Sequence, residues 1–235
     1  IWSAPLPEQP SRESVPWRKM DSAVQYLKHC RPVLKKERKC KGRFIKEWER
    51  TQMSKKVYIF LADGFEDIEG LTVVDLMRRA GIDIVTVSIK NTRQITTAHG
   101  ITMFTDTTFK ETDFSDADML VLPGGQPGTT NLGAFEPLTD LLKNFHNNGG
   151  KIAAICAAPT VFAGIGLLHG KKATAYPSCM DGLGDAQRLE DKVVVEGTIT
   201  TSRGLGTAID FSLSLIGQLL DQETADKIAK SVVYK

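Results

Sequence analysis

The chain has no long uninterrupted hydrophobic run. Its most apolar stretch, residues 152–168, is broken by a proline, a threonine and two glycines, whereas a membrane-spanning helix needs ~20 consecutive apolar residues. We therefore expect no membrane association, and the stretch is better explained as a buried strand, a sharp turn and a helix. The start of the chain also lacks a charged segment followed by an apolar one, so the sequence predicts no secretory signal peptide.

Cysteine is scarce. The 235 residues include four, which are too few and too scattered for a disulfide framework or a zinc site: Cys30, Cys40, Cys156 and Cys179. The histidines at 99, 146 and 169 share no spacing typical of a metal site and are interpreted as surface or loop residues. The sequence thus predicts no metal, and free thiols suit a reducing, cytoplasmic location.

Most of the chain also lacks an excess of positive charge. Residues 1–50 hold 13 Lys and Arg against 6 Asp and Glu, whereas residues 51–235 hold 17 against 22. The basic character therefore belongs to the beginning of the chain, and the rest is mildly acidic. The charge balance does not imply a general nucleic-acid-binding body, and contact with nucleic acid is expected at most through the basic leader.

The first 52 residues differ from the rest. Four prolines fall within the first 16 residues, and residues 35–50 form a charge run with little to bury. The sequence begins with Ile1, while Met53 directly precedes the first clear strand. We expect residues 1–52 to be a basic leader, disordered or a non-native extension, with Met53 as the natural start. The alternatives are an arm that touches nucleic acid and an organelle-targeting segment. Residues 53–235 are expected to form one domain.

Strands and helices alternate along this domain. Strands are expected at 57–61, 82–89, 101–104, 118–122 and 152–155, with a hairpin over 193–201, and helices at 68–79, 137–145, 206–220 and 225–232. The alternation predicts an α/β flavodoxin-like sandwich, in which helices cover both faces of a mostly parallel sheet. Ligands bind beyond the carboxyl ends of such strands. Three loops leave strands there: 62–69, 123–128 and 156–159.

Cys156 stands at the sharpest of these turns. It follows the apolar run 151–155 and precedes Ala157, Ala158 and Pro159, a helix start in which proline is tolerated. The cysteine would then occupy a strand-to-helix turn, a nucleophile elbow that exposes its side chain over a helix N-terminus. The partial positive charge and free N–H groups there favour a thiolate and can hold an oxyanion. The alternative is a buried, inert cysteine.

Side chains in the neighbouring loops are candidates for the same site. Glu69 lies one helical turn in, where a carboxyl buried beside a cysteine would keep its proton and could donate or shuttle it. Gly124 and Gly125 can bring backbone N–H groups close to a reacting oxygen, or form only a tight turn. Arg203, between a strand and a helix start, either binds an anion or ties down its loop.

Five segments of the domain form a recognisable set in their order and spacing: ADGFEDIEG (62–70), DLMRRAGI (75–82), VLPGG (121–125), AAICAAP (153–159) and TSRGLGT (201–207). With them, residues from about Lys55 to Val233 resemble the ThiJ/PfpI family within the class I glutamine-amidotransferase-like group. The resemblance is to the branch of the parkinsonism-associated protein deglycase. It implies that Cys156 is the elbow nucleophile and an oxidisable thiol, and that Glu69 is its protonated partner.

The resemblance also implies roles around this pair. Gly125 and Ala157 match the backbone donors of an oxyanion hole, although protease-like members have a catalytic histidine at the position of Ala157. Arg79 and Arg203 match arginines near the dimer interface and the site. Tyr176 stands where several members have a site histidine, so a cysteine–glutamate dyad is expected rather than a triad. Candidates for anion or substrate binding are Arg79, Gly124, Tyr176 and Arg203. Members are usually homodimers that need no organic cofactor or metal.

By the same resemblance, the protein is expected to be a cofactor-independent cysteine enzyme of the glyoxalase or protein deglycase type, a hydrolase or lyase. Its substrates would be α-oxoaldehydes such as methylglyoxal, or glycated adducts. One alternative is a redox-sensing, chaperone-like oxidative-stress protein whose cysteine is oxidised to a sulfinic acid. A weaker one is a thiamin- or thiazole-related protein, for which these residues offer no specific support.

Overall fold

The computed structural model describes residues 54–234. The leader predicted over residues 1–52 lies outside this part, so its nature and its boundary stay predictions. The main sheet consists of β1 (Lys56–Leu61), β2 (Asp83–Ser88), β5 (Thr107–Thr108), β6 (Met119–Leu122), β7 (Lys151–Ile155), β10 (Val193–Glu196) and β11 (Ile199–Ser202). Two small ladders pair β3 (Gln94–Thr96) with β4 (Thr102–Phe104), and β8 (Lys172–Ala173) with β9 (Gln187–Arg188).

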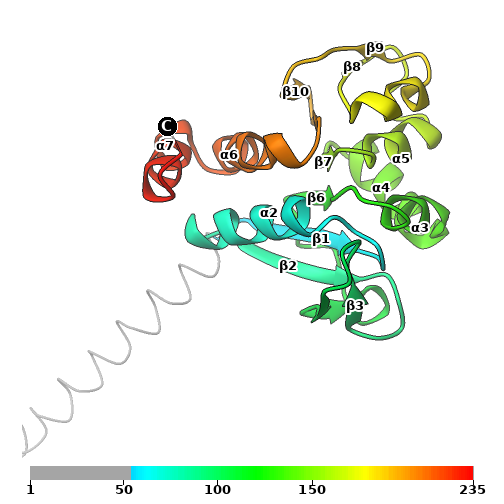
Figure 1. The fold of residues 1–235 in the computed structure, drawn as a ribbon, viewed down its shortest axis with the longest axis horizontal. Coiled ribbons are helices and arrows are strands. Elements are labelled where there is room, and N and C mark those ends of the chain that lie inside the picture. Colours follow the sequence, from blue (N-terminus) through cyan, green and yellow to red (C-terminus); the bar gives the residue numbers. More distant parts are fainter. Residues whose placement is uncertain (1–53, 235) are drawn as a thin grey trace, which may run out of the picture. The chain divides into compact units, whose positions relative to one another are not determined.

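The seven strands of the main sheet lie in the order β10-β11-β7-β6-β1-β2-β5. Every neighbouring pair is parallel except β10 and β11, which form the predicted hairpin. The carboxyl ends of β1, β6, β7 and β11 therefore meet at one edge of the sheet. This arrangement brings together loops that are far apart in the sequence (Figure 1).

Helices cover both faces, as predicted for a flavodoxin-like sandwich. They are α2 (Asp67–Arg79), α3 (Gly128–Ala134), α4 (Glu136–Asn147), α5 (Pro159–Gly164), α6 (Ala208–Leu219) and α7 (Gln222–Ser231), with 3-10 turns η2 (Phe109–Glu111), η3 (Pro177–Leu183) and η4 (Leu205–Thr207). One apolar cluster joins α2, α6 and α7 to the sheet, and a second joins α3, α4 and α5 to it. The two clusters lie on opposite sides of the sheet.

Strand β1 illustrates why the sheet is buried on both faces. Successive side chains of a strand point to opposite faces. Accordingly, Val57, Ile59 and Leu61 belong to the first cluster, and Tyr58 and Phe60 to the second. Burial of each such side chain stabilises the fold by roughly 1.5–3 kcal/mol. The continuous apolar run is therefore a consequence of helices on both sides.

Two predicted elements need correction. Residues 101–104 were expected to be a strand of the main sheet, but β4 pairs only with β3 in a separate antiparallel hairpin. The helix predicted from residue 206 begins as the 3-10 turn η4 and becomes α-helical at Ala208. Helix α3 was not predicted, because the sequence GTTNLGA has two glycines, two threonines and an asparagine, all weak helix formers. The remaining predicted elements are confirmed within a few residues at their ends.

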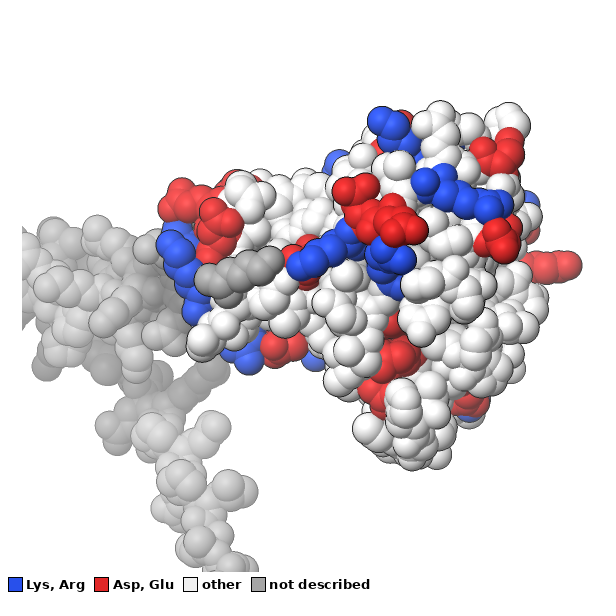
Figure 2. Space-filling view, turned by 45° about the horizontal axis from the view of Figure 1, so that its top comes forward, with Lys and Arg blue, Asp and Glu red and all other residues white. Residues whose placement is uncertain are grey.

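The sequence predicted neither a membrane-spanning helix nor a general nucleic-acid-binding surface. Within residues 54–234, no helix combines the length and the apolar character that crossing a bilayer requires. On the face shown in Figure 2, Lys and Arg side chains lie next to Asp and Glu. They do not gather there into a continuous basic surface of the kind that nucleic acid requires.

Candidate active site

Cys156 lies in the predicted elbow. It follows β7 directly, and α5 begins three residues later at Pro159. Its φ of 66° is in the left-handed region, which a residue with a side chain rarely adopts. Two backbone hydrogen bonds hold this conformation: the Cys156 N–H donates to the Ser202 carbonyl at 2.9 Å, and the Tyr176 N–H donates to the Cys156 carbonyl at 2.8 Å. The strand–elbow–helix prediction is confirmed, and the thiol is half-buried.

Glu69 reaches the thiol from the first turn of α2. Its side chain is 1% exposed, and its carboxyl is hydrogen-bonded to the Cys156 side chain. One carboxyl oxygen, Oε2, accepts the backbone N–H of Gly124 at 3.0 Å. The helix start is fixed by Glu66, whose carboxylate accepts the Glu69 N–H at 2.7 Å. The predicted cysteine–glutamate dyad is therefore present as a geometric pair.

The ionisation of Glu69 and that of Cys156 depend on each other. Burial raises the pKa of Glu69 to about 7, against the hydrogen bonds from Cys156 and Gly124. Burial also raises the pKa of Cys156, and the charge of an ionised Glu69 raises it further. The two groups cannot both ionise near neutral pH, so the pair carries at most one negative charge. The N–H groups at the helix N-terminus favour a thiolate, as expected, but burial and Glu69 outweigh them, so the sulfur ionises only while Glu69 holds the proton.

Backbone N–H groups surround the sulfur as expected. Those of Ala157 and Gly125 are directed at the Cys156 side chain and partly offset the rise in its pKa. Gly125 has a φ of 91°, and a Cβ there would lie 2.3 Å from the backbone nitrogen of Glu66. Only glycine allows this close approach. Two N–H donors next to a nucleophile form the elements of an oxyanion hole.

Gly124 has a different role from the one expected. Its N–H is engaged by Glu69, so it positions the acid and is not free to bind an anion. A Cβ at Gly124 would lie 2.5 Å from the Cys156 Cβ and 2.6 Å from Glu69 Oε2. The glycine therefore lets the acid and the thiol meet across the turn after β6.

The two candidate arginines pair with acidic residues. The Arg203 guanidinium donates to the Glu190 carbonyl at 2.9 Å and lies 3.7 Å from the Glu190 carboxylate, so it ties down its loop. Arg79 ends α2 and pairs with Asp75 at 2.7 Å. It follows Glu69 by ten positions in the same helix, which is about 15 Å along the helix axis. These contacts account for both guanidinium groups in the structure, and anion binding by either arginine stays a prediction.

Tyr176 does belong to the site, and Gly204 joins it there. A Cβ at Gly204 would lie 3.3 Å from the Tyr176 ring, 3.6 Å from Glu69 Oε1 and 3.8 Å from Cys156 Sγ. The backbone of Gly204 thus forms a wall shared by all three side chains. The residue stands in the quoted segment TSRGLGT, yet sequence reasoning singled out only Arg203. A glycine two residues after a strand end was the signal that could have found it.

The side chains of His99 and His169 pair with acidic residues and not with the Cys156 thiol. His99 is exposed and pairs with Asp67 at 2.5 Å, which raises its pKa through that hydrogen bond. His169 pairs with Asp185 at the surface. Among the described residues, Glu66, Asp67 and His99 offer ligand atoms within 4.8 Å of one another and could hold a metal ion. The ion pair already accounts for the contact between two of them.

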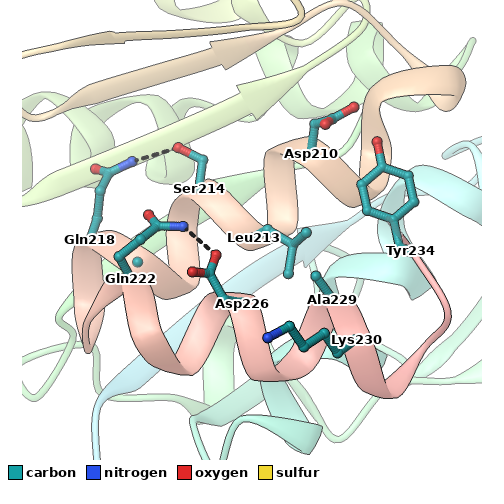
Figure 3. Close-up of a pocket in the computed structure, with 10 residues that line it drawn as sticks. Asp210, Leu213, Ser214, Gln218, Gln222, Asp226, Ala229, Lys230 and Tyr234 are labelled. Carbon is teal, nitrogen blue, oxygen red and sulfur yellow. Dashed lines mark hydrogen bonds between the residues drawn. The ribbon is translucent and has the colours of Figure 1, made fainter.

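The structure has a hollow between α6 and α7, which is not at the Cys156 thiol. About 680 Å³ of space lies between α6 and α7. Figure 3 shows side chains from both helices around it, with Gln222 donating to Asp226 and Gln218 hydrogen-bonded to Ser214. None of the residues that line it contributes to the dyad. The candidate site is therefore identified by its chemistry and not by the volume of a pocket.

Fold and site together define an α/β protein with a cysteine on a nucleophile elbow and a buried acid beside it. The model of the DJ-1/PfpI family matches residues 55–218. The chain belongs to this family. It is 40% identical over 184 residues to "Protein DJ-1 homolog B" of Arabidopsis thaliana, covering 77% of this chain and 42% of that protein. The chain spans less than half the length of this protein and of its homolog A.

Two further relatives are informative. "Glutathione-independent glyoxalase DJR-1.2" of Caenorhabditis elegans is 30% identical over 167 residues, covering 70% of this chain and 88% of that protein. The solved structure "Toxoplasma gondii DJ-1, oxidized" superposes with a TM-score of 0.74 at 37% identity, covering 77% of this chain and 99% of that one. The family and the fold expected from the five sequence segments are confirmed.

Proposed function

We propose that this protein is a cofactor-independent cysteine enzyme of the glyoxalase or protein deglycase type, which acts on α-oxoaldehydes such as methylglyoxal or on their adducts. The observation that carries the proposal is the buried Glu69 carboxyl hydrogen-bonded to the Cys156 thiol. The name of the relative from Caenorhabditis elegans, a glutathione-independent glyoxalase, supports the same chemistry. A reducing compartment such as the cytoplasm suits the free thiols of Cys156 and Cys179.

The first step is addition of sulfur to the aldehyde carbon. A bond forms between Cys156 Sγ and that carbon, the thiol proton passes to Glu69, and the carbonyl electron pair moves onto oxygen. The N–H groups of Gly125 and Ala157 point to this region and stabilise the oxyanion. One such donor contributes ~10²–10³-fold in rate in other enzymes. Return of the proton gives a hemithioacetal.

Rearrangement and hydrolysis complete the reaction. Glu69 moves the proton of the former aldehyde carbon to the neighbouring carbonyl carbon, and the hydroxyl proton passes to the oxygen of that carbonyl, which converts the hemithioacetal into a thioester of a 2-hydroxy acid. Water then cleaves the thioester: its oxygen goes to the acid, and one of its protons goes to the Cys156 sulfur. The net change is one aldehyde plus one water to one 2-hydroxy acid, without oxidant or reductant. A carboxyl with its pKa near 7 suits such two-way proton transfer.

The test is lactate formation from methylglyoxal without glutathione. We expect Cys156→Ser to lose at least ~10²-fold in kcat/KM, whereas Cys179→Ser, which replaces the other described free thiol, retains activity. Equal rates in the wild type and Cys156→Ser would contradict the proposal. Free aldehyde in equilibrium with an adduct is consumed by either activity, so this assay tests the shared chemistry of glyoxalase and deglycase.

We also propose that the protein forms a homodimer through α2 and the β3–β4 hairpin. Four large apolar side chains are exposed there: Ile68, Leu71, Ile101 and Phe104. The hairpin adjoins the start of α2, because the Ala98 N–H donates to the Phe65 carbonyl at 2.8 Å. Exposed apolar side chains on adjoining elements favour association, and an isologous dimer would cover the same surface on both copies.

Redox sensing is the second candidate function. Cys156 is half-buried but accessible, and Glu69 is placed to donate a hydrogen bond to a sulfinate oxygen. The solved relative from Toxoplasma gondii is described as an oxidised form of that protein. Intact-mass measurement after mild peroxide treatment tests this candidate. A gain of two oxygens at Cys156 with negligible turnover would favour it over the enzyme, and an unmodified thiol would exclude it.

A further inference from the structure

A second, smaller hollow lies beside the candidate active site. About 260 Å³ of space separates α3 from α5. Both walls are bonded to the residues that carry the oxyanion donors: the Thr129 N–H donates to the Gly125 carbonyl at 2.8 Å, and Thr160 Oγ1 donates to the Ala157 carbonyl at 2.7 Å. Thr160 follows Cys156 by four residues, about one helical turn. Both walls of the hollow therefore continue directly from the two turns that carry the oxyanion donors.

The chemistry of the hollow is uncharged and hydrogen-bonding. No Asp, Glu, Lys, Arg or His is among the described residues that line it. Thr129 is 3% exposed, and its hydroxyl has no hydrogen-bond partner within the described residues. A buried hydroxyl without a hydrogen-bond partner lowers stability by roughly 1–3 kcal/mol. A ligand group that bonds to the Thr129 hydroxyl would therefore bind favourably. Gln126 and Thr130 add an amide and a second hydroxyl, which bond to each other at 2.8 Å.

These groups match a peptide amide better than a charged ligand. An amide has one donor and one acceptor, and the hollow offers both hydroxyl donors and oxygen acceptors. Val161 and Ile165 provide an apolar side for a small side chain. A phosphate, carboxylate or ammonium group would find no opposite charge among the described lining residues. The volume is below the ~300–1,000 Å³ of a complete ligand pocket, so the hollow suits only part of a substrate.

We propose that the hollow between α3 and α5 is a subsite for the uncharged backbone amide of a peptide whose aldehyde adduct is bound at Cys156. This inference rests on the proposed function and adds to it a subsite for the peptide part of a glycated adduct. Two extended residues reach up to ~7 Å, which is enough to pass from the sulfur to the next helical turn.

The test compares two alkylating probes on the full chain. Iodoacetamide and iodoacetyl-alanyl-alaninamide both react by forming a bond from Cys156 Sγ to carbon as iodide leaves, and only the second carries a peptide. Rates of Cys156 modification are followed by peptide mass mapping. We expect the ratio of the two rates, peptide probe to iodoacetamide, to exceed the ratio for free cysteine about tenfold, equivalent to about one good hydrogen bond.

Two variants locate the effect. Gly133→Leu fills the hollow from α3, where a Cβ would make an ordinary 3.5 Å contact with Val161. Thr129→Val removes the unpaired hydroxyl at nearly constant shape. Ala134→Leu, on the same helix but outside the lining, is the matched control. We expect the first to abolish the preference, the second to reduce it about threefold, and the control to keep it, with the iodoacetamide rate unchanged in all three.

A rate ratio that is the same in the wild type, Gly133→Leu and Ala134→Leu would overturn the subsite. So would a wild-type ratio equal to that of free cysteine. Because alkylation needs no turnover, this result is independent of the methylglyoxal assay. Loss of the peptide preference with intact lactate formation would refute only the subsite. A retained preference without lactate formation would refute only the proposed enzyme.

Discussion

The backbone N–H of Gly124 donates to the Glu69 carboxyl at 3.0 Å. This single contact links the turn after β6 to the first turn of α2. It also holds the acid against the thiol at the end of β7, because the Gly124 backbone fits closely between the two side chains. The position of the Glu69 carboxyl is thus set in part by a residue without a side chain.

Gly124→Ala should therefore disable the site. The added methyl would lie 2.5 Å from the Cys156 Cβ and 2.6 Å from Glu69 Oε2, so one of them must move. We expect kcat/KM with methylglyoxal to fall about 10²-fold and the free energy of unfolding to fall by about 1–3 kcal/mol. Gly133→Ala, where the new methyl makes an ordinary contact, is the control. Unchanged kinetics in Gly124→Ala would show that the contact is dispensable.

The stability of the protein should depend on pH through Glu69. Its pKa in the folded state is about 7, above the ordinary value of 4.5, so the folded state binds this proton more tightly than the unfolded state. The resulting stabilisation is complete below about pH 4.5 and is lost as pH rises through 7, and it amounts to about 3 kcal/mol at most. We expect the free energy of unfolding of Glu69→Gln, measured in urea, to rise by this amount relative to that of the wild type between about pH 4.5 and 8. A difference that does not vary with pH would contradict the raised pKa.

Activity should rise with pH over the same range. The singly charged pair is the reactive form, and it appears as the pair loses its first proton near pH 7. We expect kcat/KM for methylglyoxal to increase through this pH, and Glu69→Gln to lower it about 10²-fold and to remove the inflection. The charge of Glu66 contributes to the raised pKa, so Glu66→Gln should move the inflection to lower pH. An inflection near pH 7 that survives in Glu69→Gln would assign it to another group.

Association should depend on the apolar surface of α2 and the hairpin. Ile68 is 48% exposed and Phe104 is 70% exposed. We expect Ile68→Asp and Phe104→Asp each to weaken self-association at least tenfold, because a carboxylate must then be buried in the interface. Val195, also 48% exposed but on β10, provides the control Val195→Asp. Sedimentation equilibrium measures the effect, and a dimer unaffected by both substitutions would place the interface elsewhere.

The sequence predicted what depends on local pattern. The apolar run of β1 and the helical spacing of α2 identified the sandwich, and the strand–proline order around Cys156 identified the elbow. Helix α3 escaped because weak helix formers are held there by packing of Leu132 in the second cluster. The expected strand at residues 101–104 was assigned to the wrong sheet, because its pairing with β3 is a tertiary choice.

The members of the site and the raised pKa of Glu69 were predictable, but the effect of Glu69 on the thiol was not. The five quoted segments indicated Cys156, Glu69, Gly125 and Ala157, yet no pattern shows that burial forces the acid and the thiol to share one charge. Arg203 and Arg79 carried the chemistry of anion binding but lie against Glu190 and Asp75. Partners of this kind are fixed by three-dimensional packing, which spacing along the chain does not encode.

The thiol, the acid and the glycine between them come from loops after β7, β1 and β6, and Gly204 follows β11. These strands are neighbours in space but span almost the whole domain in sequence. A growing chain thus holds an ordinary cysteine until its last strand has docked. Abnormal reactivity of that sulfur would then be a signal that synthesis and folding are complete, which makes a thiol probe a reporter of nascent-chain maturation.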